Sequence, residues 1–416
     1  MWGDDYYTSN NTAIMCRRKE FYHPDRGLMC DPYKANHKLP SGFFKKIVDQ
    51  KVQYLLGNGL ESEHKDSLNR LTGDIDKHLI DIGTIASKKS MAWAYLYKDN
   101  GQDKVTIIPN EQVVSFWDGD VIQLIVRFYK TTEVIDNEIE HINKAELWDK
   151  DTVKIFVKID KEYKFQNEMC HYYDTVEFNG AKEQQDGHAW GFVPFIPLFN
   201  NKEALSDLKP IKPQIDIYDI TKSDFANNID DMQDAYYILK NYSGQDPGEF
   251  LEQLKAHKAV PVGEGGDVEP KQLEIPTEAR KVFLDSITRD IYEFSMSVDM
   301  KSVSGGQLTN VAIASMYADL DLKADQFESE IQAYLLKLLE ITSPNAEADF
   351  AFDRSLVFNV EDRINSLKDL GVQISNKTKL GMFPLIDDVD EEEKRIKEEI
   401  EQNATDIDND MGFGDE

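Results

Sequence analysis

Cysteine is scarce in this chain of 416 residues, which contains only Cys16, Cys30 and Cys170. Three scattered cysteines exclude a disulfide framework and do not have the spacing of a zinc site. The sequence also lacks an apolar run of the ~20 residues that a membrane-spanning helix needs, and its start lacks the apolar segment of a signal peptide. We therefore expect a soluble protein that is made in a cytoplasm and keeps its thiols reduced.

Basic residues are few, with 47 Lys and Arg against 77 Asp and Glu and a net charge of −30 at pH 7. This balance argues against a protein that grips nucleic acid tightly, because such proteins gain affinity when Lys and Arg replace counterions. It does not exclude a surface past which nucleic acid slides, since an acidic wall repels a duplex and does not hold it.

Catalytic motifs are lacking as well. The sequence has no P-loop, no Gly-x-Ser-x-Gly and no His-Glu-x-x-His, and its eight histidines show no metal-ligand spacing. The acidic pairs Asp230-Asp231 and Asp387-Asp388 are adjacent, so on a helix their side chains point about 100° apart and suit acid–base chemistry poorly. We predict no catalytic residues, no metal and no cofactor.

Three long amphipathic segments dominate residues 205–341. The first helix is predicted over residues 213–240, with Pro213 in its first turn and apolar side chains at three- and four-residue steps. It would be about 40 Å long. The second is predicted over residues 277–298 and the third over residues 310–341. The apolar side chains of each helix form a narrow stripe, the apolar seam. A helical bundle core explains these seams, and narrow seams on long helices also suit packing against other copies of the chain.

The polar side chains of the first helix have two interpretations. They form a solvated helix face, or they line a channel that avoids sticking to DNA. Lys212, Lys222 and Lys240 interrupt the acids and could contact phosphates weakly or form ion pairs between subunits. The polar residues placed away from the apolar seam are Asp216, Asp219, Asp224, Asn227, Asn228, Asp230, Asp231 and Asp234.

The part of the chain before residue 205 is predicted to be a mixed α+β body. Residues 1–37 are polar and expected to be irregular, with a turn from His23 to Gly27. Two helices follow, and the apolar stripe of the first is interrupted by Lys51. The prolines make residues 190–197 extended. The helices are predicted over residues 38–56 and 68–87, and the strands over residues 91–97, 104–108, 121–129, 145–148, 153–159 and 163–165.

Two further regions complete the predicted organisation. Residues 241–276 are expected to form a small insert that buries little by itself and depends on neighbouring subunits; it would contain a helix over 247–255 and strands over 258–262 and near 271–275. After Pro344 we expect an extended piece over 355–359 and helices over 360–370 and 390–402. The acidic end of the chain is predicted to be disordered over its last dozen residues.

Several stretches together resemble the portal (head–tail connector) proteins of tailed phages, in the group typical of siphophages of Gram-positive hosts. No single stretch is decisive, but their order and spacing over about 350 residues make the resemblance fairly specific. The stretches are residues 43–57, 193–197 with 199–201, 206–208 with 215–218, 223–230, 374–375 with 378, and 387–393.

The resemblance implies an α+β portal fold assembled as a ring, usually of twelve copies, at one vertex of the capsid. It implies a mixed α+β wing, a long helical stem, a small α/β clip, a tunnel loop and a helical crown. The implied boundaries are residues 1–204 for the wing, 205–240 and 277–298 for the stem helices, 241–276 for the clip, 299–309 for the tunnel loop, 310–342 for a long wing helix, and 343–416 for the crown and acidic tail.

The tunnel loop would narrow the channel and face DNA. Its glycines permit backbone conformations closed to other residues, so the loop can shift, and Lys301 is its one cation. We hypothesise that Lys301 touches phosphates weakly; the alternative is an ordinary helix connection with a solvated lysine. The residues implied for this loop are Lys301, Ser302, Val303, Ser304, Gly305, Gly306 and Gln307.

The clip would be the docking site of the terminase motor and, later, of the head-completion (adaptor) protein. The implied partners are further copies of the chain, double-stranded DNA, the large terminase, the head-completion protein, and the major capsid and scaffolding proteins, with no membrane. The clip residues predicted to take part are Asp246, Glu249, Lys255, Glu264, Asp267 and Glu269.

The predicted function is therefore that of a DNA conduit in the virion, assembled in the host cytoplasm and driven by the ATP hydrolysis of a separate motor. One alternative is a ring-forming adaptor or capsid-associated protein that never contacts DNA. A second alternative is an acidic α+β enzyme with an unrecognised site. The mass of the purified particle separates these classes, because a stable monomer favours the enzyme.

Overall fold

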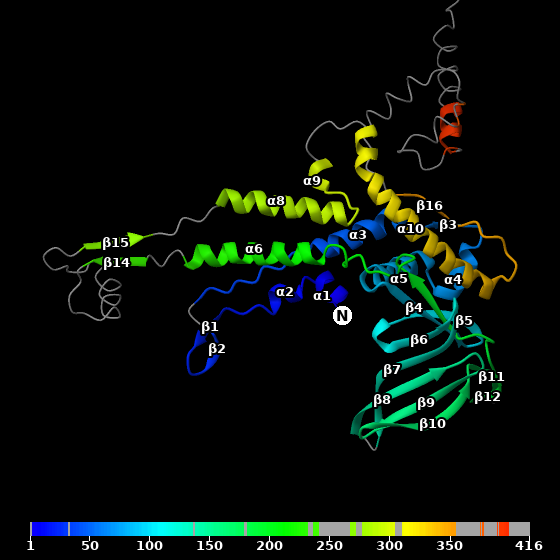
Figure 1. Ribbon diagram of the computed structural model, residues 1–416. Helices are drawn as coiled ribbons and strands as arrows, with labels where there is room; N and C mark the ends of the chain where they lie inside the picture. Colours follow the sequence, from blue (N-terminus) through cyan, green and yellow to red (C-terminus); the bar gives the residue numbers. More distant parts are fainter. Residues whose placement is uncertain are drawn as a thin grey trace, which may run out of the picture. The chain divides into compact units, whose positions relative to one another are not determined.

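The computed structural model describes residues 2–31, 34–135, 138–178, 181–231, 236–240, 267–271, 277–303 and 310–354, together with 375, 377, 389 and 391–398. The chain divides into two compact units. The first contains Met1–Ser297 and Lys323–Asp353, and the second contains Val298–Leu322 and Arg354–Glu416. The fold is a mixture of helices and antiparallel sheets (Figure 1).

The helices and strands follow one another along the chain as labelled in Figure 1. The helices are α1 (Trp2–Tyr7), α2 (Thr12–Met15), α3 (Phe43–Leu56), α4 (Lys65–Thr72), α5 (Ile75–Lys89), α6 (Lys212–Asp231), α8 (Thr277–Phe294), α9 (Met300–Val303) and α10 (Asn310–Thr342). The strands are β1 (Glu20–His23), β2 (Gly27–Cys30), β3 (Leu60–Glu61), β4 (Met91–Asp99), β5 (Gln102–Ile108), β6 (Val113–Asp118), β7 (Val121–Ile135), β8 (Glu138–Trp148), β9 (Thr152–Ile159), β10 (Glu162–Cys170), β11 (Tyr172–Phe178), β12 (Ala181–His188), β13 (Phe195–Phe199), β14 (Tyr236–Lys240), β15 (Asp267–Lys271) and β16 (Ala351–Phe352).

The main core of the first unit joins helices α3 and α5, the second half of α10 and the three-stranded sheet β13-β4-β5. Each helix contributes apolar side chains at three- and four-residue steps, so one face of each is buried. On α10 this stripe includes Phe327, Ile331 and Leu338, all nearly inaccessible to solvent. The predicted third helix is thus confirmed, and its bounds differ from the expected ones by one residue.

A second core lies where the three-stranded sheet meets the five-stranded sheet of β6 to β10. It contains Trp93, Ile125, Trp148 and Phe195. The five strands form an antiparallel meander in the order β10-β9-β8-β7-β6, which confirms the strands predicted from alternating apolar residues. Strand β6, which is not among the strands predicted from the sequence, forms one edge of this sheet.

Two predictions for the first hundred residues need correction. The helix expected over residues 68–87 is two helices, α4 and α5, because Gly73 adopts a φ of +87° and ends α4. Asp74 then begins α5, where its side chain accepts a hydrogen bond from the backbone N–H of Lys77. The first 37 residues are also more ordered than predicted: they contain α1, α2 and the hairpin β1–β2, whose turn lies at the expected place, between His23 and Gly27.

The first long helix is shorter than predicted. Helix α6 ends at Asp231, so it is about 30 Å long. Residues expected to continue it form strand β14, which pairs with β15 from Lys240↔Asp267 to Tyr236↔Lys271. The run Tyr236-Tyr237-Ile238-Leu239 has the aromatic and β-branched character of a strand, and pairing across the insert outweighs its helical spacing.

Most of the other elements predicted for residues 241–276 lie outside the described part of the chain. The strand of this region that the structure describes is β15, Asp267–Lys271, which overlaps the strand expected near residues 271–275 at Lys271; residues 272–275 lie outside the described part of the chain. The helix expected over 247–255 and the strand over 258–262 lie outside the described residues. Helix α8 begins at Thr277 as predicted and ends at Phe294, four residues early.

The second unit contains α9 and the first part of α10. The Tyr317 hydroxyl lies 3.7 Å from the Met300 sulfur, and Arg354 forms an ion pair of 2.7 Å with Asp321. Residues 391–398 are helical, which confirms the predicted charged helix over that stretch. The elements expected over 355–359 and 360–370 lie outside the described residues.

Candidate functional site

Helices α6 and α8 lie side by side and run in opposite directions (Figure 1). We call them the helix pair. At one end the Phe43 ring contacts both helices, with its centroid 4.9 Å from that of Tyr218 and 6.0 Å from that of Tyr292. Further along, the Arg280 guanidinium lies 5.7 Å from the centre of the Phe225 ring. These contacts fix which residues of the two helices lie at the same level.

The buried face of α6 is polar from Asp219 onward. Asp219 and Ser223 are 0% exposed and Asn227 is 1% exposed, whereas Ile229, which belongs to the predicted apolar seam, is 50% exposed. The three buried residues are spaced by four, so they lie along one face of the helix. Because burying polar groups without partners is costly, this face requires donors from elsewhere in the chain.

The donors come from an extended segment nearly 200 residues earlier in the sequence. The backbone N–H groups of His37, Leu39 and Ser41 donate in turn to Asn227 Oδ1 (2.5 Å), Ser223 Oγ (3.0 Å) and Asp219 Oδ1 (2.9 Å). Two residues of extended chain span about 6.6 Å, and four residues of helix span about 6 Å. The two periods match, so alternate N–H groups meet every fourth residue of α6. We call this arrangement the polar seam.

Side chains of the N-terminal segment extend the polar seam in both directions. The Tyr6 hydroxyl donates to Asp216, and the Asn11 amide donates to Asp219. Asp224 forms ion pairs with Arg17 (2.8 Å) and Lys19 (2.9 Å), and Asp230 pairs with His37. The described residues of the segment before α3 are thus bound to α6 along most of its length.

The pKa values of two seam carboxylates shift in opposite directions. Burial raises the pKa of Asp219 above its ordinary value, since the hydrogen bonds from Asn11 and Ser41 offset only part of the desolvation. Burial also acts on Asp224, but Lys19 and Arg17 outweigh it and lower the pKa of that carboxyl. Neither sequence-based interpretation of these acids holds for Asp219, because it is neither solvated nor available to line a channel. The signal that could have revealed this is the polar stripe at four-residue steps.

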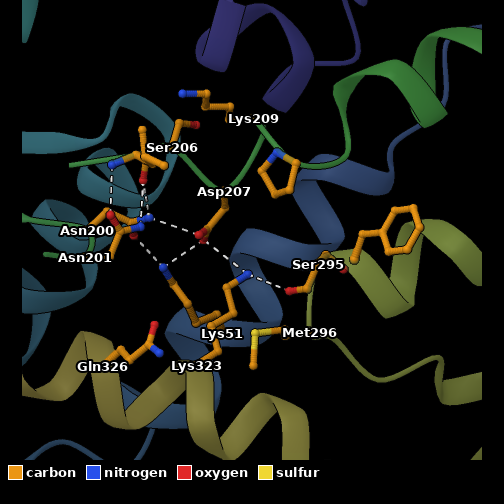
Figure 2. Close-up of a pocket in the computed structure, with 13 residues that line it drawn as sticks. Lys51, Asn200, Asn201, Ser206, Asp207, Lys209, Ser295, Met296, Lys323 and Gln326 are labelled. Carbon is orange, nitrogen blue, oxygen red and sulfur yellow. Dashed lines mark hydrogen bonds and ion pairs between the residues drawn. The ribbon is translucent and has the colours of Figure 1, made fainter. Parts of the chain in front are cut away.

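A second charged site lies just before α6, where Asp207 meets two lysines (Figure 2). We call Lys51, Asn200, Asp207 and Lys323 the lysine cluster. Lys51 Nζ lies 2.8 Å from Asp207 Oδ2 and donates to Asn200 Oδ1 at 2.6 Å. Lys323 Nζ lies 3.5 Å from the same carboxylate. The Asn200 amide also donates to Asp207 Oδ1 at 2.9 Å, so both carboxylate oxygens have partners.

The lysine cluster connects four parts of the first unit. Lys51 comes from α3, Lys323 from α10, and Asp207 from the loop that leads into α6. Lys323 also donates to the carbonyl of Ser295 at the end of α8, at 2.9 Å. Both helices of the pair are therefore linked to the core through these charged residues, which border a pocket of about 480 Å³.

Sharing one carboxylate between two cations sets the protonation of the cluster. Burial, reinforced by the nearby Lys323 charge, lowers the pKa of Lys51 to about 8 despite its contact with Asp207. Burial alone would raise the pKa of Asp207, but the two lysines outweigh it and bring that pKa to about 2. The negative charge of Asp207 is balanced by two positive charges, whereas the two lysines have to share this one carboxylate. The signal in the sequence is Lys51 within an otherwise apolar helical stripe.

The three lysines predicted to line a channel lie in different environments. Lys212 is half-buried; it pairs with Asp216 at 2.7 Å, and its Nζ lies 4.9 Å from the centre of the Trp2 ring. Lys222 is exposed and lies over the Tyr218 ring. Lys240 is the last residue of β14, opposite Asp267. A contact of any of the three with DNA stays a prediction.

The predicted tunnel-loop and clip residues are only partly described. Lys301, Ser302 and Val303 form part of α9; Lys301 is exposed, and its backbone N–H donates to the Asp299 carboxylate at 3.2 Å. Asp267 and Glu269 lie in β15, and Glu269 is opposite Ile238. The remaining predicted residues lie outside the described part of the chain: Ser304, Gly305, Gly306, Gln307, Asp246, Glu249, Lys255 and Glu264.

Neither a membrane span nor a metal site is found among the described residues. No helix in that part of the chain combines the length and apolar character that a membrane crossing requires. Over the same residues, no three His, Cys, Asp or Glu side chains are grouped as metal ligands would be.

Comparison with known proteins gives a consistent set of relatives. The model of a family described as "Phage portal protein, SPP1 Gp6-like" matches residues 1–406. The portal protein of Bacillus phage SPP1 is 30% identical over 430 residues, which cover 97% of this chain and 84% of that protein. The portal protein of Clostridium phage phiCD119 is 27% identical over 409 residues, covering 90% and 88%. Among solved structures, one chain from the virion of a native gene transfer agent particle matches 91% of this chain and 99% of its own length, with 11% identity and a TM-score of 0.46.

Proposed function

From the premise that this chain belongs to the SPP1 Gp6-like family of phage portal proteins, we propose that its copies close into a ring of twelve at one vertex of the capsid. The ring conducts double-stranded DNA during packaging and ejection. The observation that carries the proposal is the family match over residues 1–406. A portal protein is a structural component of the virion, so the energy for DNA movement comes from a separate motor.

The helix pair supports the proposed roles of the individual segments. Helices α6 and α8 serve as the stem, and the paired strands β14 and β15 begin the clip, where the large terminase and later the head-completion protein dock. The body before residue 205 and helix α10 serve as the wing, where the capsid and scaffolding proteins are expected to bind, and the residues after 343 serve as the crown. The charged links from the stem to the wing, through Lys323 and Ser295, keep these parts in register when force acts on the stem.

The proposed DNA channel works by weak contact. An acidic chain of net charge −30 repels the duplex, which limits adhesion during translocation. Lys301 of the tunnel loop is exposed and supplies a transient contact to phosphates. Such contacts must be few, because each phosphate neutralised by Lys or Arg adds affinity that the motor has to overcome.

The mass and shape of the purified protein test the ring. Twelve chains of 47.8 kDa give a particle of about 570 kDa, which negative-stain images down its axis should show with a central hole. A compact monomer at every concentration would contradict the proposal. A closed ring that neither supports DNA packaging with the terminase nor binds it would favour the adaptor that never contacts DNA.

The substitution Lys301→Glu tests the channel role. It should leave ring assembly unchanged and alter the amount of DNA packaged, because the tunnel loop then repels the duplex. Lys150→Glu is the matched control, since Lys150 is exposed in a turn of the five-stranded sheet. Packaging is measured as nuclease-protected DNA per particle. Equal packaging by Lys301→Glu, Lys150→Glu and wild type would reject the contact with DNA.

A further inference from the structure

The hairpin β1–β2 carries apolar side chains that the folded chain leaves exposed. Tyr22 and Leu28 lie directly opposite each other on the two strands and are 72% and 71% exposed. Phe21 is 40% exposed. A two-stranded hairpin without a covered face is marginally stable in water, so a further surface is needed to cover it.

The position of the hairpin along the helix pair is fixed by an ion pair before it and by a hydrogen bond between a histidine and an aspartate after it. Lys19, just before β1, pairs with Asp224, and His37, after β2, pairs with Asp230. Both partners lie in the second half of α6. The hairpin is therefore held at the level of that part of α6, with Tyr22 and Leu28 still exposed.

A second exposed apolar patch lies at the same level of the helix pair. Its members are Ile229 on α6 and Val282 and Phe283 on α8, which are 50%, 67% and 43% exposed. The contact of Arg280 with Phe225 places this part of α8 beside the last third of α6. We call these three residues the helix-pair patch.

Charged side chains of both signs surround the two apolar surfaces. The hairpin exposes Arg18 and Arg26 together with Glu20 and Asp25, and the helix-pair patch is flanked by exposed Glu278 and Asp285 together with Lys281 and Arg289. The apolar side chains therefore carry the match, and the mixed charges around them form a polar rim of the kind that borders protein interfaces.

We infer that the hairpin β1–β2 of one copy docks on the helix-pair patch of the neighbouring copy. This inference rests on the proposed ring, because a ring repeats one heterologous contact between two different surfaces of each subunit. Both surfaces lie at the same level of the chain, so adjacent copies in a ring bring them to the same height. A contact of this kind also makes the N-terminal segment a strap that is fastened to its own α6 along the polar seam and to the next subunit through the hairpin.

Cross-linking tests the inference directly, because Cys30 ends β2 and is exposed. In a Cys16→Ser, Cys170→Ser background that forms rings, Val282→Cys should allow oxidation or a short bismaleimide to join neighbouring chains through Cys30. The expected product is a ladder of covalent multimers on a denaturing gel. Ile139→Cys is the matched control, since Ile139 is as exposed as Leu28, and it should give no ladder.

The outcomes separate the inference from the proposed function. Rings that form without a Cys30–Val282→Cys ladder would overturn the hairpin contact and leave the portal ring intact. Failure of the wild-type chain to form any ring would overturn both. A ladder of equal yield from the Ile139→Cys control would also overturn the inference, because it would reflect random collision.

A second measurement does not depend on cross-linking geometry. The double substitution Tyr22→Ser, Leu28→Ser should raise the protein concentration at which half of the chains are assembled by about tenfold or more, because each interface loses two buried apolar side chains. Ile139→Ser should leave that concentration unchanged. Assembly of the double variant at the wild-type concentration would contradict the proposed contact.

Discussion

The lysine cluster and the polar seam both bury carboxylates in the first unit, but they compensate the charge in different ways. In the cluster, Asp207 is balanced by two positive charges, one on the buried Lys51 and one on the partly buried Lys323. In the seam, Asp219 is held by neutral donors, a backbone N–H and an amide. Opposite charges hold a carboxylate ionised and lower its pKa, whereas neutral donors leave part of the desolvation cost in place and the pKa stays raised.

The two sites also differ in how the stabilisation is distributed. The cluster concentrates it in a few groups that cannot be removed one at a time, because the remaining charges would stay buried without a partner. The seam spreads it over many hydrogen bonds along α6, so one loss leaves the rest in place. We expect the cluster to fix the position of the helix pair on the core, and we expect the hydrogen bonds of the seam to open locally.

The largest effect should come from Asp207→Ala. This change leaves the buried Lys51 and the partly buried Lys323 side by side without their shared anion, which is expected to cost about 3–5 kcal/mol of unfolding free energy. Urea unfolding of the full chain measures it. The control Asp151→Ala removes a carboxylate from an exposed pair, 3.9 Å from Lys150, and should change stability by under about 1 kcal/mol.

Removing all three charges sharpens this prediction. Because the desolvation cost of buried ions offsets much of their attraction, the triple variant Lys51→Met, Asp207→Leu, Lys323→Met should recover most of the loss seen in Asp207→Ala. A triple variant that is as unstable as Asp207→Ala would mean that shape, not charge pairing, makes the cluster important.

A smaller effect is expected from Asp219→Ala in the polar seam. The Asn11 amide and the Ser41 N–H would lose their acceptor, which should cost about 1–3 kcal/mol. Because the neighbouring bonds to Ser223 and Asn227 remain, the loss should be local. Hydrogen exchange of the Ser41 amide should then accelerate more than that of amides in α3. Uniform acceleration of hydrogen exchange throughout the first unit would contradict local opening of the polar seam.

The pH dependence of the two carboxylates should have opposite signs. The pKa of Asp207 falls from 3.8 to about 2 on folding, so its contribution is fully present above about pH 3.8 and is lost as pH falls toward 2, an effect of about 2 kcal/mol. The pKa of Asp219 is raised on folding, so its carboxylate costs stability as pH rises above the ordinary value. Unfolding free energies of Asp207→Asn and Asp219→Asn, each compared with wild type across acid pH, should therefore diverge in opposite directions. Parallel curves would contradict the assigned shifts.

The sequence predicted elements whose burial follows from their own pattern. Alternating apolar residues located the strands of the five-stranded sheet, and the stripe through Phe327, Ile331 and Leu338 located α10. Both patterns are local, because each residue's face is set by its neighbours three, four or two positions away. The resemblance to phage portal proteins added the family, which the spacing of apolar residues does not indicate. The match of the family model over residues 1–406 confirms that the chain belongs to this family.

Predictions from the sequence were wrong where the residue that forms the hydrogen bond, or the strand that pairs, lies far away along the chain. The apolar spacing of α6 favoured burial of Ile229, yet the polar side is buried because His37 and its neighbours supply donors 190 residues from Asn227. The end of α6 was missed for a similar reason, since β14 depends on pairing with β15. Lys51 stood out as a charge in an apolar stripe, but its partners Asp207 and Lys323 could not be identified before the fold brought them together.

The smallest effect is expected from Asp224→Ala, which removes the anion shared by Arg17 and Lys19 at the partly exposed edge of the seam. Their ion pairs of 2.8 and 2.9 Å involve side chains that are 24–29% exposed, so solvent screens them and the loss should stay under about 1 kcal/mol. The difference from wild type should also shrink at high salt, because screening weakens the pairs already present in wild type. Trypsin provides a second readout, since cleavage after Arg17, Arg18 or Lys19 should become faster once this edge is released while the core resists. A loss as large as that of Asp207→Ala, insensitive to salt, would show that the seam concentrates its stabilisation as the lysine cluster does.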